Sequence, residues 1–490
     1  MSTDEATLPA VTEPVTAGTT PTPRRRSVAG AGRWLWHAAR TNKAFTALLA
    51  VAALVRVAMM VTYYPAFGYF VDTRAYMLSA KSWDTDPIWP FGYPFFLYLL
   101  APFERTSVVA LTQHLLGLGM GVVVYALLRR RGLARRWSAL AAAPILLDAR
   151  ELVVEHHVLS DTLFSVLLLA AVALLLWTDR LPIWVAALSG GLIAAASLTR
   201  TIGQVLIVIV VAYLILRRVG WKQVLAFCVA VAIPLSGYMV WFHHEHGVYA
   251  INSYTGRYMW ARTTTFVDCD KIDFTPQERE LCPLEPLGQR LGPDSYLWFD
   301  DPTDLVTRYK DDNIYKSFAT KAILAQPDEY FKVVMADTVH MFQPGWHGPW
   351  RTECVHDRWN MPSAGSGEVC APTLMVKPFI PGAEAGGGDP ANWQNKIMHA
   401  YGKVFTVPSL AYVIALLLIF ALALRRPRKQ HGRENLDAVF LGTVSVALVM
   451  MSLALSAIDI RYVMPLLTLA PVAVALSVRR LRRPAEAIES

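Results

Sequence analysis

AFTALLAVAALVRVAMMVT, residues 44–62, is the first long apolar run of this chain. A helix needs roughly 20 predominantly apolar residues to cross a bilayer, and this run has that length. In lipid every backbone polar group needs an internal partner, which favours helices over an open sheet. The alternating pattern that is typical of an outer-membrane barrel is absent from the sequence. The run therefore predicts an all-α membrane protein whose further spans follow along the chain.

Composition leads to the same class. Of the 490 residues, 54% are hydrophobic and 17% charged, and the mean hydropathy is +0.34. A soluble domain carries about 25% charged residues, so this balance indicates a membrane protein. The net charge of +8 does not indicate nucleic acid, because the basic residues lie in short clusters beside apolar runs. Residues 1–32 are rich in Thr, Pro, Ala and Gly and lack an apolar signal region, so residues 1–43 are predicted to be a disordered basic cytoplasmic tail.

Ten apolar runs predict a polytopic protein with about seven helices over residues 44–241 and three over residues 404–478. Basic clusters, such as those at 129–131 and 425–429, fall in alternate connections between the runs. Positive charges mark cytoplasmic loops, so both termini are predicted to lie inside. The run 137–149 is short, but the alternation fails without it. The predicted spans are residues 44–62, 107–128, 137–149, 158–177, 182–198, 201–216, 223–241, 404–424, 436–457 and 461–478.

This topology is that of a multi-pass plasma-membrane protein with a large outer part. Loop 63–106 and the long segment 242–403 are predicted to lie outside, and residues 479–490 form a cytoplasmic tail. The long segment is expected to be a mixed extracytoplasmic unit, and disulfides fit its oxidising surroundings. Each closed loop would be worth about 3 kcal/mol in the chain-entropy model, with free buried thiols as the alternative. The cysteines nearest in sequence are expected to pair: Cys269 with Cys282, and Cys354 with Cys370.

The octapeptide YFVDTRAY, residues 69–76, follows the first span on the predicted outer side. It sets the carboxylate of Asp72 at a membrane surface, beside Arg74 and among aromatic residues, which makes Asp72 the leading candidate for a catalytic base. A short amphipathic helix is expected from Asp72 to Trp83, so capping of that helix is an alternative role for Asp72. The aromatic, proline-broken segment 89–98 is expected to lie at the headgroup level.

Other ionisable residues fall at the same predicted level. Glu155 and Asp161 flank the start of the fourth span, where charges are costly and usually face a cavity or a partner. Capping of that span is the alternative for Asp161. Arg200 and Arg461 begin the sixth and tenth spans, and an arginine offers charge and paired donors to a phosphate. Together these residues predict an outward-facing site that handles an anionic group.

Two polar features have plainer explanations. Arg56 lies in the outer half of the first span, where snorkelling accounts for it. The turn at His243-His244-Glu245-His246 does not have the spacing of a zinc motif. No Walker A sequence or Rossmann glycine pattern is present, so a cytoplasmic nucleotide site is not indicated.

Four short motifs occur in order on the predicted outer side: Asp72-Thr73-Arg74-Ala75-Tyr76, Leu159-Ser160-Asp161-Thr162-Leu163-Phe164, Leu198-Thr199-Arg200 and Arg461-Tyr462-Val463-Met464-Pro465. In this order they resemble the GT-C superfamily of membrane glycosyltransferases. The likeness covers residues 44–241 and 404–478, and it is closest to protein O-mannosyltransferases and the aminoarabinose transferases of lipid A. The segment 242–403 departs from both families and is more similar to actinobacterial relatives, which leaves the acceptor open.

The resemblance implies transfer of a hexose or pentose from a polyprenyl-phosphate donor, with inversion at the sugar. The acceptor would be an extracytoplasmic protein, lipid or cell-wall glycan, reached from the membrane without any nucleic acid. Asp72 would be the catalytic base, and no residue set demands a cofactor, although a divalent cation stays open. The residues implied in donor or phosphate binding are Arg461, Arg200, Arg150 and Arg74. Those implied in orienting the acceptor are Glu155, Asp161, Tyr76 and Tyr462.

A transporter or flippase of lipid-linked sugars is the main alternative. Such proteins also carry charges within their spans, often with inverted repeats and broken helices. No repeat is visible here, and the ionisable residues gather at one face rather than at the midplane. A scaffold that kept the fold and lost activity is a third hypothesis, which Asp72 disfavours.

Overall fold

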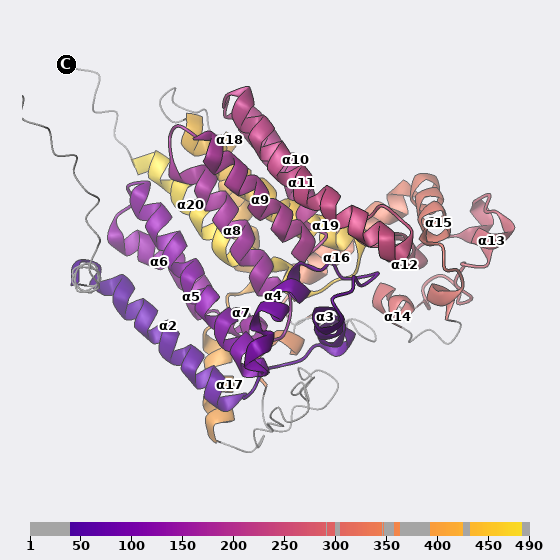
Figure 1. Ribbon diagram of the computed structural model, residues 1–490, viewed down its shortest axis with the longest axis horizontal. Coiled ribbons are helices and arrows are strands. Elements are labelled where there is room, and N and C mark those ends of the chain that lie inside the picture. The colour runs from indigo at the N-terminus through magenta and orange to yellow at the C-terminus, as the bar shows by residue number, and fades with distance from the viewer. Residues whose placement is uncertain are drawn as a thin grey trace, which may run out of the picture.

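A computed structural model gives the arrangement of the chain, and the regular structure of its described residues is helical (Figure 1). One isolated parallel bridge, between Phe67 and His157, is the exception among them. The residues that the structure describes are 40–290, 292–298, 304–344, 346, 357–362, 393–424 and 432–482. The all-α polytopic fold expected from hydropathy is thus confirmed.

Each of the ten predicted spans coincides with a helix of the bundle. Within the described residues, six helical stretches are long and apolar enough to cross a membrane. The others have 13–17 residues and rise only about 20–26 Å, short of a hydrocarbon core of about 30 Å. The bundle helices are α2 (Lys43–Thr62), α5 (Thr106–Arg130), α6 (Arg135–Leu147), α8 (Asp161–Trp177), α9 (Ile183–Thr199), α10 (Gly203–Leu216), α11 (Trp221–His246), α18 (Ser409–Leu424), α19 (Gly432–Leu455) and α20 (Leu466–Arg482).

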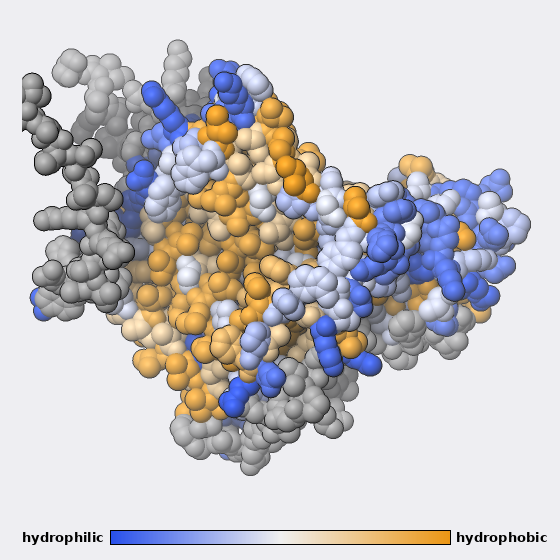
Figure 2. All heavy atoms as spheres, in the orientation of Figure 1, coloured by the Kyte–Doolittle hydropathy of each residue, from blue (hydrophilic) through white to orange (hydrophobic). Residues whose placement is uncertain are grey.

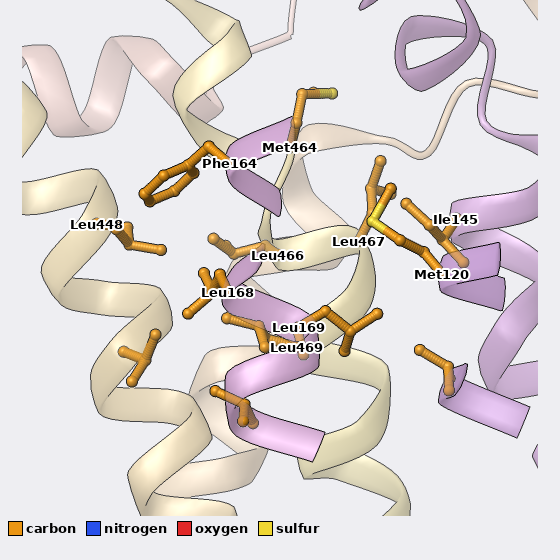
Figure 3. Close-up of a cluster of buried hydrophobic side chains, with 14 of the residues drawn as sticks. Met120, Ile145, Phe164, Leu168, Leu169, Leu448, Met464, Leu466, Leu467 and Leu469 are labelled. Atoms are coloured by element: carbon orange, nitrogen blue, oxygen red, sulfur yellow. The ribbon is translucent and has the colours of Figure 1, made fainter. Parts of the chain in front are cut away.

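The centre of the bundle is apolar on every side. Helix α8 is hydrophobic all round, which is typical of a helix buried among others. Its Phe164, Leu168 and Leu169 pack against α19 and α20, and residues of α5 and α6 close the cluster (Figure 3). This packing holds α8, α19 and α20 close together.

A second, smaller unit lies beside the bundle and has its own core. It contains α12 (Thr255–Thr264), α13 (Pro276–Arg279), α14 (Pro293–Leu297) and α15 (Asp312–Ala325), and α16 (Pro327–Phe342) returns from it to α19. We call residues 255–325 the outer lobe. The hydropathy surface changes from apolar over the bundle to mostly polar over this lobe (Figure 2).

The cysteines of the outer lobe are paired as predicted. Cys269 and Cys282 form a disulfide beside the lobe core of Trp260, Tyr315 and Phe318. The other expected pair, Cys354 with Cys370, lies outside the described residues. The described part of the long outer segment is helical and includes α17 (Trp393–Val404).

Short helices cover the end of the bundle that faces the lobe. They are α3 (Phe70–Ser82), α4 (Gly92–Leu100), α7 (Ala149–His156) and the 3₁₀ turn η7 (Ile460–Val463). The expected helix of the first loop is confirmed as α3. The segment expected to be broken by proline instead forms α4, because Pro94 stands in its first turn, where a missing N–H costs no helical bond. A Cβ at Gly92 would lie 2.5 Å from the Leu198 carbonyl oxygen, so glycine lets α4 approach the end of α9.

Candidate active site

A cavity of about 580 Å³ opens where the outer lobe meets the covered end of the bundle. Its walls come from α3, the α9–α10 turn, the end of α19, η7, and helices α12 and α14 of the lobe. Segments far apart in sequence therefore meet in one space. Five of the residues predicted for the site line this cavity: Asp72, Tyr76, Arg200, Arg461 and Tyr462.

Helix α3 is fixed so that Asp72 faces this cavity. The backbone of Phe67 exchanges hydrogen bonds with the chain after α7, accepting from Val158 and donating to His156, both at 2.9 Å. Thr73 donates its hydroxyl to the Val158 carbonyl at 3.0 Å and accepts from the Tyr69 amide at 2.8 Å. The first turn of α3 is thereby held against the bundle. No side chain makes a capping hydrogen bond at the start of α3. The alternative role of Asp72 as the cap of this helix is therefore not supported.

Asp72 and Arg461 form the central pair of the site. Oδ2 of Asp72 lies 3.5 Å from Nη1 of Arg461, and the two side chains are only 10% and 12% exposed. Burial raises the pKa of Asp72 to about 6, although the neighbouring Arg461 guanidinium acts in the opposite direction. A carboxylate with a pKa near neutrality can both lose and gain a proton at physiological pH.

A second acid–arginine pair lies next to the first. Asp161 accepts a hydrogen bond from Arg200 and also lies 3.9 Å from Nη1 of Arg461. It stands at the first position of α8, yet the structure shows no capping bond from a side chain there. Oδ2 of Asp161 and Nε of Arg461 are buried atoms without a hydrogen-bond partner in the described part of the chain. The ionic centre is therefore only partly satisfied.

Sequence reasoning did not identify Asp459 and Tyr69 as the residues that position the Arg461 side chain. Asp459 caps η7 by accepting the amide of Arg461 at 3.0 Å, and its Oδ2 lies 3.3 Å from Nε of Arg461. Asp459 also accepts the indole N–H of Trp359 at 2.6 Å and the hydroxyl of Tyr69 at 3.2 Å. The guanidinium of Arg461 stacks on the Tyr69 ring, 4.7 Å from its centroid. Tyr69 stands in the quoted octapeptide, and Asp459 lies two residues before the quoted motif that begins at Arg461, but nothing in either stretch of sequence marks its role.

The cavity walls differ in chemistry. The α10–α19 wall carries the apolar side chains of Ile202, Val205, Met451 and Leu455, together with the polar Gln204, Ser452 and Ser456. The centre carries the charges described above. The wall toward the lobe is aromatic and carries Trp89, Tyr258 and Trp298. A molecule with a lipid chain, an anionic group and a sugar would meet a different surface with each part.

Four residues predicted for the site are not among the described residues that line the cavity; Asp161 is one, and it reaches the ionic centre through Arg200 and Arg461. Arg74 is exposed on α3. Arg150 is buried on α7, and its Nε and Nη1 have no hydrogen-bond partner among the described residues. Glu155 accepts from Nε and Nη2 of Arg56 at 2.9 and 2.7 Å. This pair also corrects the snorkelling explanation of Arg56, whose side chain is 3% exposed and turns inward.

The histidine-rich turn at residues 243–246 makes hydrogen bonds and ring contacts within the protein. In the turn, Glu245 accepts the Thr85 amide at 2.6 Å and His243 stacks on Tyr249. Within the described residues, no group of three or more His, Cys, Asp or Glu side chains could hold a metal ion. The described residues thus provide no fit for a divalent cation.

Comparison with known proteins yields distant structural similarities only. No protein-family model matches the chain, and no curated protein matches it in sequence. One similar solved structure is the archaeal oligosaccharyltransferase AglB from Archaeoglobus fulgidus, in complex with an inhibitory peptide and a dolichol-phosphate. It is 12% identical with a TM-score of 0.41, over 89% of this chain and 50% of AglB. This chain thus spans about half the length of AglB.

Two further similar structures are of ArnT from Cupriavidus metallidurans. In the apo state ArnT is 12% identical with a TM-score of 0.33, over 89% of this chain and 77% of ArnT. Bound to undecaprenyl phosphate it is 13% identical with a TM-score of 0.31, over 90% of this chain and 78% of ArnT. AglB and ArnT are GT-C membrane glycosyltransferases, the superfamily that the sequence motifs resemble. At these TM-scores neither activity transfers to this chain.

Proposed function

We propose that this protein is a membrane glycosyltransferase that moves a sugar from a polyprenyl-phosphate donor to an extracytoplasmic acceptor. One observation carries the proposal: the buried carboxylate of Asp72 lines a cavity and lies 3.5 Å from Arg461. This arrangement offers a base and a phosphate-binding cation side by side. The apolar side chains on the cavity's α10–α19 wall suit the lipid chain of such a donor.

The proposed reaction is a single displacement at the anomeric carbon. Asp72 accepts the proton of an acceptor hydroxyl while that oxygen forms a bond to the anomeric carbon. The bond between the anomeric carbon and the phosphate oxygen breaks, and its electron pair leaves with the polyprenyl phosphate. The sugar inverts, and the proton on Asp72 passes to solvent before the next turnover. A base with a pKa near the working pH is suited to this role.

The arginines act on the leaving group. Charge grows on the phosphate oxygen as the bond breaks, and guanidinium groups stabilise such charge through paired donors. Arg461 is the first candidate because it lines the cavity directly beside Asp72. Arg200 is the second, held by Asp161 and lying over the ring of Tyr462 at 5.7 Å.

The test is a transfer assay with purified protein and a synthetic polyprenyl-phosphate sugar. The wild type should form a new glycosidic product, and Asp72→Asn should slow product formation by about 10²–10⁴-fold. Asp84→Asn is the matched control, because Asp84 is an exposed carboxylate of the same loop. Full transfer by both Asp72→Asn and Arg461→Ala would refute the site. Movement of intact donor across vesicles without any transfer would establish a transporter instead.

A further inference from the structure

A line of aromatic rings crosses from the bundle to the outer lobe along one side of the cavity. Tyr76 lies edge-on to Tyr93 at 4.9 Å and to Trp89 at 6.1 Å between ring centroids. Trp89 stacks on Trp298 at 5.9 Å with ring planes 12° apart. Trp298 in turn lies edge-on to Tyr258 at 6.3 Å. The rings come from α3, α4 and the loop between them, and from the lobe helices, so this aromatic wall joins the two units.

Four of these rings line the cavity: Tyr76, Trp89, Tyr258 and Trp298. Trp89, Tyr258 and Trp298 are only partly buried, so each keeps surface that a ligand can cover. Tyr258 is also close enough to Asp72 for the two groups to interact electrostatically. Tyr76, at the other end of the cavity-lining rings, interacts electrostatically with Asp72 as well, so both ends of the aromatic wall lie near the base.

The polar groups along the aromatic wall include neutral side chains, one acid and one arginine. Asn252 and Thr255 line the cavity there, and Oδ1 of Asn252 accepts the Thr255 hydroxyl at 2.8 Å. The carboxylate-bearing Asp294 of α14 lines the same side. Arg358, the cation on this side, donates to the hydroxyl of Tyr69 at 3.0 Å. The cations Arg200 and Arg461 lie at the other side, with the acids that pair with them.

We propose that the acceptor is a neutral saccharide that stacks on this aromatic wall, with Trp89 and Trp298 as its main platform. The proposal deepens the glycosyl transfer inferred above and rests on it. A sugar ring presents a face of C–H groups and an edge of hydroxyls. Aromatic faces offer apolar area and a negative quadrupole to the C–H face. Carboxylate, amide and hydroxyl groups such as those of Asp294, Asn252 and Thr255 suit the hydroxyl edge.

Other acceptor classes fit the aromatic wall less well. An anionic acceptor would need arginine or lysine donors. Among the described cations that line the cavity, Arg461 and Arg200 sit at the ionic centre, and Arg358 already donates to the Tyr69 hydroxyl. An extended peptide is commonly recognised by adding a strand to a sheet edge, and the described residues form no sheet. A saccharide uses side-chain rings and polar edges, which this wall supplies.

Equilibrium binding to the full-length protein in detergent tests the proposal without any turnover. The probes are short neutral oligosaccharides of mannose or of arabinose, and a threonine-rich peptide, measured by titration calorimetry. The wild type should bind at least one oligosaccharide series and not the peptide. Trp298→Ala should weaken that binding by about tenfold or more, as truncation of a buried aromatic anchor does.

Two further variants keep the result interpretable. Trp83→Ala is the matched control, since Trp83 packs on Phe91 and Tyr98 and is not among the described residues lining the cavity. It should leave oligosaccharide binding unchanged. Trp298 also packs against the lobe core, so Trp298→Phe should recover most of the binding that Trp298→Ala loses.

The outcomes separate this inference from the proposed function. Peptide binding that is weakened by Trp298→Ala, without any saccharide binding, overturns the saccharide proposal. Saccharide binding that is absent, or equal in wild type and Trp298→Ala, overturns it as well. Saccharide binding that depends on Trp298, together with full transfer by Asp72→Asn, upholds the acceptor class and refutes only the assigned base.

Discussion

Two ionic clusters lie within the same half of this protein, and they differ in how completely their atoms are satisfied. The first is the ionic centre of the cavity, where Asp72, Asp161, Arg200 and Arg461 meet. The second is a closed cluster of Arg56, Glu155, His114 and His156 between α2, α5 and α7. We call them the open centre and the closed cluster.

The closed cluster is saturated with hydrogen bonds. Arg56 donates twice to Glu155 and also to the carbonyls of Ala52, Ile145 and Leu146. Both carboxylate oxygens of Glu155 accept from Arg56, and Oε2 also lies 2.7 Å from Nδ1 of His114. The side chains of Arg56 and Glu155 are 3% and 0% exposed. A buried charge network of this kind holds helices in place, and it leaves no atom free to meet a substrate.

The open centre borders a cavity and retains buried atoms that have ion-pair contacts but no hydrogen bond among the described residues. Buried polar groups without partners are costly, so they persist mainly where function requires them. Oδ2 of Asp161 and Nε of Arg461 are such atoms within the described part of the chain. The difference teaches that buried charge alone does not indicate a site; incomplete satisfaction beside a cavity does. Each prediction below tests one side of this contrast.

Glu155→Gln should cause the largest effect, on stability. The substitution leaves the buried guanidinium of Arg56 without its counter-charge, and breaking a buried pair costs about 3–5 kcal/mol. Thermal or denaturant unfolding in detergent measures the loss. Asp72→Asn should show no comparable loss, because burial disfavours the charged form of Asp72 in the folded state. Equal destabilisation by both variants would erase the contrast.

The double variant Arg56→Met with Glu155→Leu sharpens that result. Replacing both members of a buried ion pair by apolar residues of similar size is often neutral or stabilising. Recovery of stability in the double variant would show that the closed cluster acts in packing, and the sugar-transfer rate per folded molecule should then approach that of the wild type.

Arg461→Met should reduce activity by about 10²–10³-fold, the loss seen when a donor to developing negative charge is removed. Arg74→Met is the matched control, because Arg74 is an exposed arginine two residues from Asp72. Its transfer rate should stay within about twofold of wild type, as for surface substitutions generally. A large loss in Arg74→Met would restore the donor-binding role first expected for Arg74 and weaken the present site.

These two arginines show what sequence could and could not predict. Hydropathy located all ten bundle helices because helices in lipid must be apolar. The short helices of the outer lobe leave no long apolar run, so they were expected only as a mixed segment. Arg74 was grouped with Asp72 because it is near in sequence. A step of two residues rotates the side-chain direction by about 200° around the helix axis. Asp72 and Arg74 therefore point to nearly opposite sides of α3, and only one of them can face the cavity.

The site shows a similar limit. Asp72, Arg200 and Arg461 could be placed at one level from charge alternation and span order. Glu155 was assigned to the same level, but the chain breaks between α7 and α8, and the two helices direct Glu155 and Asp161 to different neighbours. Asp459 could not be found, since its role depends on Tyr69 and Trp359, which reach it from distant parts of the chain.

Gly117→Ala should have a smaller effect on the closed cluster. A Cβ at Gly117 of α5 would lie 1.7 Å from Oε1 of Glu155, so the ion pair must shift. Overpacking of this kind costs about 1–3 kcal/mol. Gly119→Ala on the same helix is the control, because its Cβ would meet nothing within 4 Å, and alanine should stabilise the helix by up to about 1 kcal/mol. Opposite signs of the two stability changes in unfolding assays would confirm how tightly the closed cluster is packed.

The smallest predicted effect is the pH dependence of the open centre. The active form of Asp72 is the carboxylate, and its pKa is about 6. The value of kcat/KM should therefore rise with pH through about 6, and at pH 5 it should be about tenfold below its plateau. A profile that stays flat down to pH 5 would contradict the assignment of Asp72 as the base.

Protonation of Asp72 at low pH lowers activity but raises stability. Unfolding caused by this protonation therefore cannot explain the loss of activity. A carboxyl group whose pKa is raised in the folded state binds more protons folded than unfolded between about pH 4 and 6. Its contribution to the free energy of unfolding therefore increases as the pH falls through that window, while its contribution to catalysis decreases. Transfer rates and unfolding midpoints measured on the same samples separate the two. Asp72→Asn should remove the inflection near pH 6 from its residual activity, whereas the matched variant Asp84→Asn should keep it, so the titrating group is located by the difference between two carboxylates of one loop.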